Sequence, residues 1–279
     1  MNYQETQPPV GKDCNLPEFN FSTLWQNPGI LIKAYKETLK AKGESMAERI
    51  GECPLPVRIH IPVHLSSEQI VSLGLDKTGD KPAVFIEKNT IFQMYVYGDK
   101  TTGEEHVAVI KGIKDGEDVP IRVHSSCLTA ETFHASNCDC HEQMEMALAI
   151  AENEGFGGVI WLHQEGRGNG LAGKTKQLKI MLEEGIDTVD AFEKAGYPRD
   201  QRDYTIAADI LRDLNVKSVR LITNNPNKIK QLAELGIEVR GRIPCEAPPA
   251  NATVRKDLKA KKDKMGHLLG SENRQSGLV

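Results

Sequence analysis

The chain lacks long apolar runs and an excess of basic charge, and both shortages narrow its possible functions. None of its 279 residues belongs to a run approaching the roughly 20 apolar residues that cross a bilayer. Its opening residues show no basic region followed by an apolar one, so we expect no secretory signal and a cytoplasmic, reducing location. A net charge of −4 gives no general attraction to nucleic acid or to an anionic membrane.

The composition is that of an ordinary globular protein, with 39% hydrophobic and 27% charged residues. Two apolar, β-rich runs within residues 89–112 predict a hairpin, and residues 118–126 predict a third strand. From residue 141 onwards, helical patterns alternate with strand patterns. We therefore predict a mixed α/β (α+β) fold, with a mixed sheet and flanking helices.

Three parts of the chain are expected. Residues 1–85 are assigned to an N-terminal extension that packs on the core. Residues 86–245 are assigned to a catalytic domain, and residues 246–279 to a tail with a basic helix. The charge run of the tail is typical of a solvated face.

Cysteines are few but clustered. Three of the six, Cys127, Cys138 and Cys140, lie in the stretch SSCLTAETFHASNCDCHEQ. A catalytic zinc site has three protein ligands plus water, and a structural site is closed by four. The spacing leaves open a catalytic zinc, a structural zinc and three buried free thiols. Candidates for a fourth ligand are His134, His141 and Cys53.

Two classes of protein are excluded because their motifs are absent from the sequence. The H-x-E…P-C-x-x-C pattern of zinc deaminases does not occur. The Gly-rich loop HQEGRGNGL, residues 163–171, does not match the phosphate-binding loop G-x-x-x-x-G-K-[ST]. Its glycines would still let the backbone approach a ligand closely. YPRDQRDY places Asp200 and Arg202 two residues apart before a predicted helix, as a surface charge cluster also would. In LITNNPNKIK a predicted strand runs into a helix whose free N–H groups could hold a phosphate with Thr223 and Lys228, or could form an ordinary cap.

Taken together and in this order, these segments resemble GTP cyclohydrolase II, the zinc enzyme that opens the imidazole ring of GTP at the entry to riboflavin synthesis. The matching pieces are RVHSSCLT, CDCHEQ, QEGRGNGL, DTV, RDYTIAADILRDL and LITNNPNKI. The resemblance as a whole runs from about residue 88 to residue 245, with an echo in KMGHLL near the C-terminus.

The resemblance implies that Cys127, Cys138 and Cys140 bind one zinc, with water at the open position. It implies that Asp200 accepts a proton and that Arg202 is the nucleophile towards the α-phosphate. The implied nucleotide contacts are Arg122, Val123, His124, Ser125, Ser126, Gln143, Glu165, Gly166, Arg167, Thr188, Thr223 and Lys228. It further implies a small nucleotide substrate, Mg²⁺ beside a triphosphate, and a homodimer.

Three positions depart from the family pattern. Ser126 stands where a glutamate is usual, His163 replaces an arginine, and Leu178 lies at or next to a catalytic tyrosine. A leucine neither donates nor accepts the hydrogen bonds of a phenol. These departures resemble the uracil-catabolism branch of the family, which implies hydrolytic opening of a uridine nucleotide (UMP). The alternatives are GTP cyclohydrolase II proper, which yields formate, pyrophosphate and a diaminopyrimidinone ribosyl phosphate, and a non-catalytic, zinc-stapled nucleotide-binding module.

Overall fold

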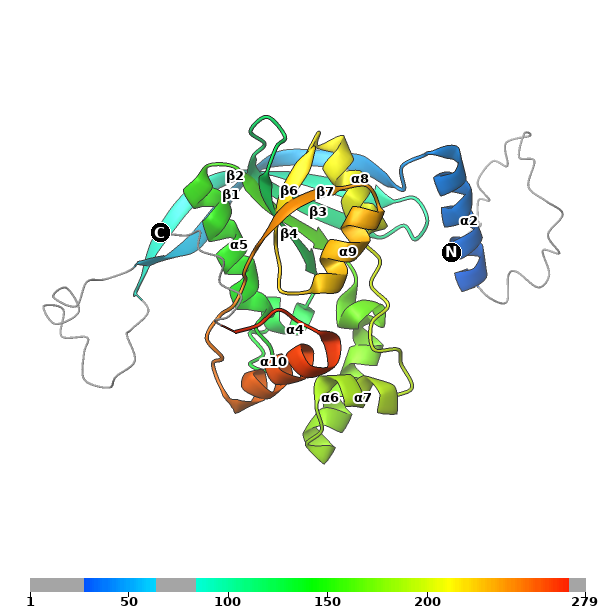
Figure 1. Cartoon of the computed structure of the whole chain (residues 1–279), viewed down its shortest axis with the longest axis vertical. Coiled ribbons are helices and arrows are strands. Elements are labelled where there is room, and N and C mark those ends of the chain that lie inside the picture. Colours follow the sequence, from blue (N-terminus) through cyan, green and yellow to red (C-terminus); the bar gives the residue numbers. More distant parts are fainter. Residues whose placement is uncertain (1–27, 64–83, 271–279) are drawn as a thin grey trace, which may run out of the picture. The chain divides into compact units, whose positions relative to one another are not determined.

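The computed structural model describes residues 28–63 and 84–270 (Figure 1). It divides into two compact units, with the boundary between Glu44 and Ser45. The described part of the first unit is helix α2 (Pro28–Lys42), whose last turn carries Lys40 and Lys42. Lysines at that end of a helix interact favourably with its dipole.

The second unit is built on a seven-stranded sheet in the order β1-β2-β3-β5-β4-β6-β7. Its strands in chain order are Ala47–Val63, Val84–Asp99, Glu105–Gly112, Val119–Ser125, Gly157–Leu162, Ser218–Ile222 and Glu238–Ile243. The first half, from β1 to β5, pairs antiparallel, and β5, β4, β6 and β7 run parallel. The hairpin predicted within residues 89–112 is confirmed as β2 and β3. The predicted mixed α/β class is confirmed as well.

The central strands are apolar because both of their faces are covered. All of β4 except its last residue is buried, and β5 is buried except at Trp161. Near-continuous burial of this kind is typical of strands in parallel arrangement. Strand β1, within the predicted N-terminal extension, pairs with β2 along its whole length. The proposed domain limits at residues 85 and 245 stay a prediction.

Helices and one 3-10 turn, η1, surround this sheet. The bounds of α4 to α10 are Leu128–Glu131, Cys140–Glu154, Gly170–Glu184, Thr188–Lys194, Thr205–Asp213, Pro226–Glu234 and Ala252–Met265, and η1 is Glu165–Gly168. Side-chain oxygens of Asp187, Asn225 and Asn251 accept hydrogen bonds from the first free N–H groups of α7, α9 and α10. Such caps explain why these helices begin where they do. Across the described residues, none of the helices combines the length and the apolar character that crossing a membrane requires.

The order of the central strands predicts a crevice at their carboxyl ends. From β4 the chain moves to β5 on one side, and from β5 it returns past β4 to β6. At such a reversal the loops after the strands diverge, and ligands of α/β proteins bind outside the carboxyl ends there. Helices α4, α6, α7 and α10 gather beyond these ends (Figure 1).

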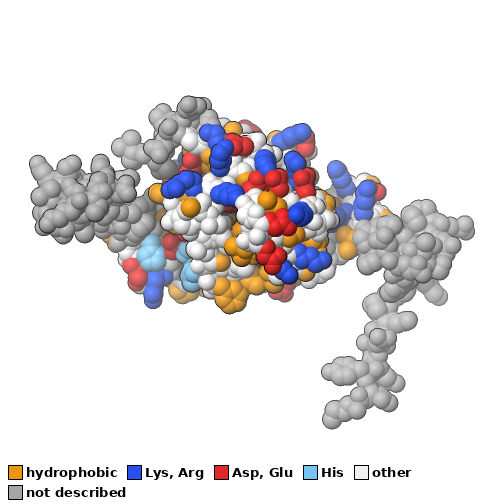
Figure 2. Space-filling model, turned by 90° about the horizontal axis from the view of Figure 1, so that it is seen from below, with side chains coloured by type: hydrophobic (Ala, Val, Ile, Leu, Met, Phe, Trp, Pro, Cys, Tyr) orange, Lys and Arg blue, Asp and Glu red, His pale blue; other side chains and the backbone are white. Residues whose placement is uncertain are grey.

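The basic tail helix is a solvated charge run only in part. Lys264 of α10 pairs at 2.6 Å with Asp187, which caps α7, and at 2.5 Å with Asp190 in the first turn of that helix. Figure 2 shows basic and acidic side chains interspersed over this face of the molecule. Most lysines of α10, among them Lys256, Lys259 and Lys262, are exposed, as the interpretation of the tail as a solvated face requires. Lys261 and Lys264 differ because they also tie the helix to neighbouring elements.

Candidate active site

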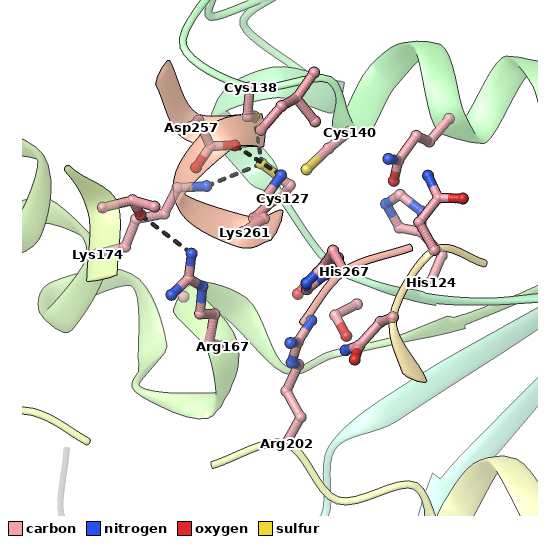
Figure 3. Close-up of a pocket in the computed structure, with 18 of the residues that line it drawn as sticks. His124, Cys127, Cys138, Cys140, Arg167, Lys174, Arg202, Asp257, Lys261 and His267 are labelled. Carbon is pink, nitrogen blue, oxygen red and sulfur yellow. Dashed lines mark hydrogen bonds and ion pairs between the residues drawn. The ribbon is translucent and has the colours of Figure 1, made fainter. Parts of the chain in front are cut away.

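A pocket opens at the carboxyl ends of β4, β5 and β6, and segments far apart in sequence form its wall (Figure 3). Most of the residues predicted from the sequence line it. They are Arg122, His124, Ser125, Ser126, Cys127, Cys138, Cys140, Gln143, Glu165, Gly166, Arg167, Thr188, Arg202, Thr223 and Lys228. Val123 and Asp200 do not line it. The backbone oxygen of Val123 accepts a hydrogen bond from Lys228, and the carboxylate of Asp200 accepts hydrogen bonds from Arg202, which does line the pocket.

The three cysteines form a cluster suited to a metal ion. Their sulfur atoms all lie within 4.8 Å of one another, and Sγ of Cys127 is 3.7 Å from Sγ of Cys138. Two sulfurs bound tetrahedrally to zinc at about 2.3 Å would be separated by about 3.8 Å. Among the described residues, no further His, Cys, Asp or Glu joins the cluster. Its donor set and spacing therefore fit a three-thiolate site with an open fourth position.

The protonation of the thiols also favours a cation between them. Hydrogen bonds from Cys138 and Cys140, together with the ammonium of Lys174, lower the pKa of the Cys127 thiol. The same contact with Cys127 raises the pKa of Cys138 to about 12. One thiolate thus opposes formation of the next until a positive charge is shared among them, and metal binding supplies that charge.

Lys174 of α6 supports the cluster from the side of the Gly-rich loop. Its ammonium lies 3.0 Å from Sγ of Cys127 and 2.9 Å from Oε1 of Glu165. The other carboxylate oxygen of Glu165 accepts a hydrogen bond of 2.7 Å from the backbone N–H of Leu128. Glu165 therefore connects η1 to the start of α4, directly beside Cys127.

Glu131 supports the cluster from the opposite side. Its carboxylate accepts hydrogen bonds from the N–H of Cys127 at 2.7 Å and from Nε2 of His124 at 2.9 Å. Nδ1 of His124 in turn accepts from Arg122. Burial and the charge of Arg122 lower the pKa of His124 to about 4, so this histidine is neutral at pH 7.

The loop after β5 has an unusual backbone. Gly166 and Arg167 both have φ of 59°, the left-handed region that only glycine adopts freely. A side chain on Gly166 would also come within 3.1 Å of Cβ of Lys174. A strained, non-glycine residue such as Arg167 persists where the surroundings fix it, and such residues cluster at functional sites. Here the carbonyl of Arg167 accepts a hydrogen bond from Gln201.

Among the described residues, three cations in the pocket have no carboxylate partner. Arg122 bonds to Gln143 and His124, Arg167 donates to Thr188, and Lys228 donates to the backbone of Val123. In the described part of the chain none of them forms an ion pair. Burial, followed by the charges of Arg122 and Arg202, lowers the pKa of Lys228 well below its usual value. An anion bound here would relieve this mutual repulsion.

Arg202 differs because its charge is matched. Its Nε lies 2.8 Å from Oδ1 of Asp200, and its Nη2 lies 2.5 Å from Oδ2. Burial acts to raise the pKa of Asp200, but the hydrogen bonds and charge of Arg202 lower it overall. This fork-shaped pairing fixes the guanidinium at the pocket wall.

Only one of the three departures from the family pattern faces the cavity. Ser126 lines the pocket, and its Oγ is buried without a hydrogen-bond partner among the described residues. His163 stacks on Trp161 with 5.8 Å between ring centroids, and 54% of its side chain is exposed. Leu178 does not line the pocket, whereas its neighbour Gln177 does. Of Leu178 and its two neighbours on α6, Gln177 is the one that lines the pocket.

Sequence reasoning missed several lining residues. They are Asn137, Lys174, Gln177, Met181, Phe192, Asn224, Asn225, Asp257, Leu258, Lys261, His267 and Leu269. Lys174 and Gln177 lie one turn apart on α6, which is the spacing of one helix face. Polar residues on the buried face of a helix were the available signal. Lys261 and His267 come from the tail, where the sequence signals were the basic run of the predicted helix for Lys261 and KMGHLL for His267.

Relatives of the chain are named for riboflavin biosynthesis. The riboflavin biosynthesis protein RibBA of Phocaeicola vulgatus is 42% identical over 225 residues, which is 80% of this chain and 54% of the relative. RibBA of Aquifex aeolicus is 47% identical over 180 residues, or 64% of this chain and 44% of the relative. The chain thus spans about half the length of the curated relatives it matches.

One solved structure also matches. It is RibBX, a two-domain 3,4-dihydroxy-2-butanone 4-phosphate synthase from A. baumannii, with 15% identity and a TM-score of 0.36 over 80% of this chain and 50% of that chain. A similarity this low supports no argument about fold or function.

The prediction of a uridine nucleotide as substrate, and of the uracil-catabolism branch, is wrong. The similar proteins are named for riboflavin biosynthesis. The structure supplies the physical reason, because two of the three departures lie outside the pocket. His163 and Leu178 therefore cannot reshape the surface that faces a base.

The remaining comparison concerns the domain itself. A family model described as GTP cyclohydrolase II matches residues 83–244. This range begins at β2, ends just after β7, and contains the three cysteines, the Gly-rich loop and the Arg202–Asp200 pair. The chain belongs to the GTP cyclohydrolase II family.

Proposed function

We propose that the chain is a zinc-dependent GTP cyclohydrolase II, which opens the imidazole ring of GTP by hydrolysis and releases formate and pyrophosphate. The observation that carries this proposal is the presence, in one pocket, of a three-thiol cluster and of three cations without carboxylate partners. The first suits metal-assisted hydrolysis, and the second suits a polyphosphate.

Zinc held by Cys127, Cys138 and Cys140 would supply Lewis-acid activation of water at neutral pH. Hydrogen bonds from Cys138 and Cys140, together with the ammonium of Lys174, lower the pKa of the Cys127 thiol, which favours the thiolate that a divalent cation would bind. The rest of the chemistry falls to the residues of the pocket wall.

The cationic residues bind and orient the nucleotide. Arg122, Arg167 and Lys228 have free charge to neutralise phosphate oxygens. Mg²⁺ is proposed to accompany the triphosphate. Arg202, positioned by Asp200, is proposed to act at the α-phosphate. Asp200 is ionised at neutral pH, as a proton acceptor must be.

The base-facing part of the pocket retains hydrogen-bonding groups. Gln177, 4% exposed, offers a side-chain amide, and Ser126 offers a hydroxyl that lacks a partner among the described residues. A buried polar group without a partner is costly, so a site of this kind favours a ligand that completes its hydrogen bonds. The family's homodimeric state remains part of the proposal.

The test follows formate release and base absorbance when the zinc-loaded protein is incubated with GTP, ATP or UTP separately. We expect turnover of GTP alone. Arg167→Met should raise the KM for GTP at least tenfold, because one charge-assisted contact is worth about 1.5–3 kcal/mol. Arg199→Met is the matched control, since Arg199 is exposed and pairs with Glu193. Nucleotide binding without any turnover would instead favour a non-catalytic, zinc-stapled module.

A further inference from the structure

The tail helix α10 and the turn after it form part of the pocket wall, although they lie beyond the residues that the family model matches. Asp257, Lys261 and His267 all line the pocket (Figure 3). This is a second, separate segment of chain facing the same cavity as the cysteines and Arg202.

The turn is anchored on both sides. Lys261 pairs with Asp139, between two cysteines of the cluster, at 3.2 Å, and with Asp257 at 2.7 Å. After α10 the N–H of Leu268 donates to the backbone oxygen of Asn224 at 2.8 Å. Gly266 ends the helix with φ of 67°, a left-handed conformation that reverses the chain towards the pocket. These contacts fix the position of His267.

The imidazole of His267 is incompletely satisfied. Its Nδ1 is buried and has no hydrogen-bond partner among the described residues. Buried polar atoms of native proteins are nearly always hydrogen-bonded, so an unsatisfied nitrogen in a side chain that lines a pocket indicates a missing ligand. Burial, followed by the charges of Lys261, Arg202, Arg167 and Lys228, lowers the pKa of His267 to about 3. The ring is therefore neutral and lies among cations.

We propose that His267 is a phosphate-binding residue, whose ring N–H at Nδ1 donates a hydrogen bond to an oxygen of the nucleotide's polyphosphate chain. This inference rests on the proposed function for the identity of the nucleotide. The cations acting on His267 include Arg167 and Lys228, which pair with no carboxylate in the part of the chain that the structure describes, so the phosphates are drawn to the same place. Lys261, already paired with two carboxylates, is a positioning residue for this turn.

A histidine suits this position better than another cation would. A neutral N–H donor binds a phosphate oxygen without adding to the repulsion among Arg167, Arg202 and Lys228. The neutral ring also carries a proton on only one nitrogen, so a donor at Nδ1 leaves Nε2 as an acceptor. His267 is thus expected to orient the polyphosphate through a hydrogen bond and to add no positive charge.

The experiment uses the full-length, zinc-loaded protein and two substitutions of similar size, His267→Asn and His267→Leu. Asparagine retains an N–H donor and leucine does not. Affinity for inorganic tripolyphosphate, GTP and guanosine is measured by calorimetry, with circular dichroism and zinc content as checks on the fold. We expect His267→Leu to weaken binding of tripolyphosphate and GTP about tenfold to a hundredfold, and His267→Asn to weaken it less. Guanosine binding should not change.

Lys259→Leu is the control, because Lys259 lies on the same helix, 76% exposed, and pairs with Asp263. It should leave all three affinities unchanged. Unchanged tripolyphosphate affinity in His267→Leu, an equal loss for guanosine, or no binding of tripolyphosphate by the unaltered protein would each overturn the inference. If tripolyphosphate binding depends on His267 but GTP is not turned over, the proposed function fails while the phosphate contact stands.

Discussion

The ammonium nitrogen of Lys174 lies 3.0 Å from Sγ of Cys127, and both residues are buried in the pocket wall. The pair joins α6, which follows the Gly-rich loop, to the cysteine cluster after β4. A buried ammonium beside a thiol favours the thiolate, which is the form that binds a metal. The contact therefore links the cysteine cluster to the helix that follows the Gly-rich loop, two segments that lie far apart in the sequence.

Lys174→Met should lower both stability and metal affinity. The change leaves Glu165 buried without its cationic partner, and breaking a buried ion pair costs on the order of 3–5 kcal/mol. Urea unfolding of the metal-free protein measures the first effect, and zinc titration the second. Lys179→Met is the control, as Lys179 is exposed on the same helix. Equal stabilities for the two variants would contradict the role given to Lys174.

Cys138→Ser should reduce zinc content and abolish GTP turnover, because a hydroxyl is a much poorer zinc ligand than a thiolate. Metal content is measured by atomic absorption after dialysis, and turnover by formate release. Cys53→Ser provides the comparison, since Cys53 is exposed and lies outside the cluster. Full zinc content in Cys138→Ser would mean that the cluster is not the metal site.

Gln177→Leu and Leu178→Ala test which of these two neighbours on α6 faces the reacting ring. The first removes the amide that faces the pocket, and loss of a group directed at transition-state charge typically lowers kcat about 10²–10³-fold. The second changes a side chain outside the pocket wall and should leave kcat and KM near their original values. Steady-state kinetics with GTP decide the point. The reverse order of effects would place Leu178, and not Gln177, at the reacting ring.

The α6 comparison shows where sequence reasoning succeeds and where it stops. Clustered cysteines, glycines and charged pairs have fixed spacing, and the structure brings Cys127, Cys138 and Cys140 together as predicted. The face that a helical residue presents depends on the helix start. A shift of one residue rotates a side chain by about 100°, which is why the sequence left Leu178 and its neighbours as alternatives and only the structure shows that Gln177 lines the pocket.

The tail shows a second limit. The lysines of α10 are indistinguishable by composition from those of a solvated helix. Lys261 reaches Asp139 and Lys264 reaches Asp187 only because tertiary packing brings α10 against these elements. Long-range ion pairs of this kind leave no local pattern in the sequence.

Acid should destabilise the metal-free protein through His124. The pKa of this buried histidine is about 4 in the folded chain, against an ordinary value of 6.5. As the pH falls from about 6.5 to about 4, the unfolded chain binds a proton that the folded chain does not, so the free energy of unfolding falls. His124→Gln should flatten this dependence in urea unfolding. His163→Gln, a change at a half-exposed histidine, should keep it. Identical pH slopes in both variants would remove His124 from the explanation.

Titration of zinc into the metal-free protein, with formate release from GTP as the readout, tests the central claim most directly. The account predicts that the rate rises from near zero and reaches a plateau at about one zinc per chain, as three thiolates with one open position require. A GTP-dependent rate that is independent of zinc, or no formate release at any zinc concentration, would contradict it.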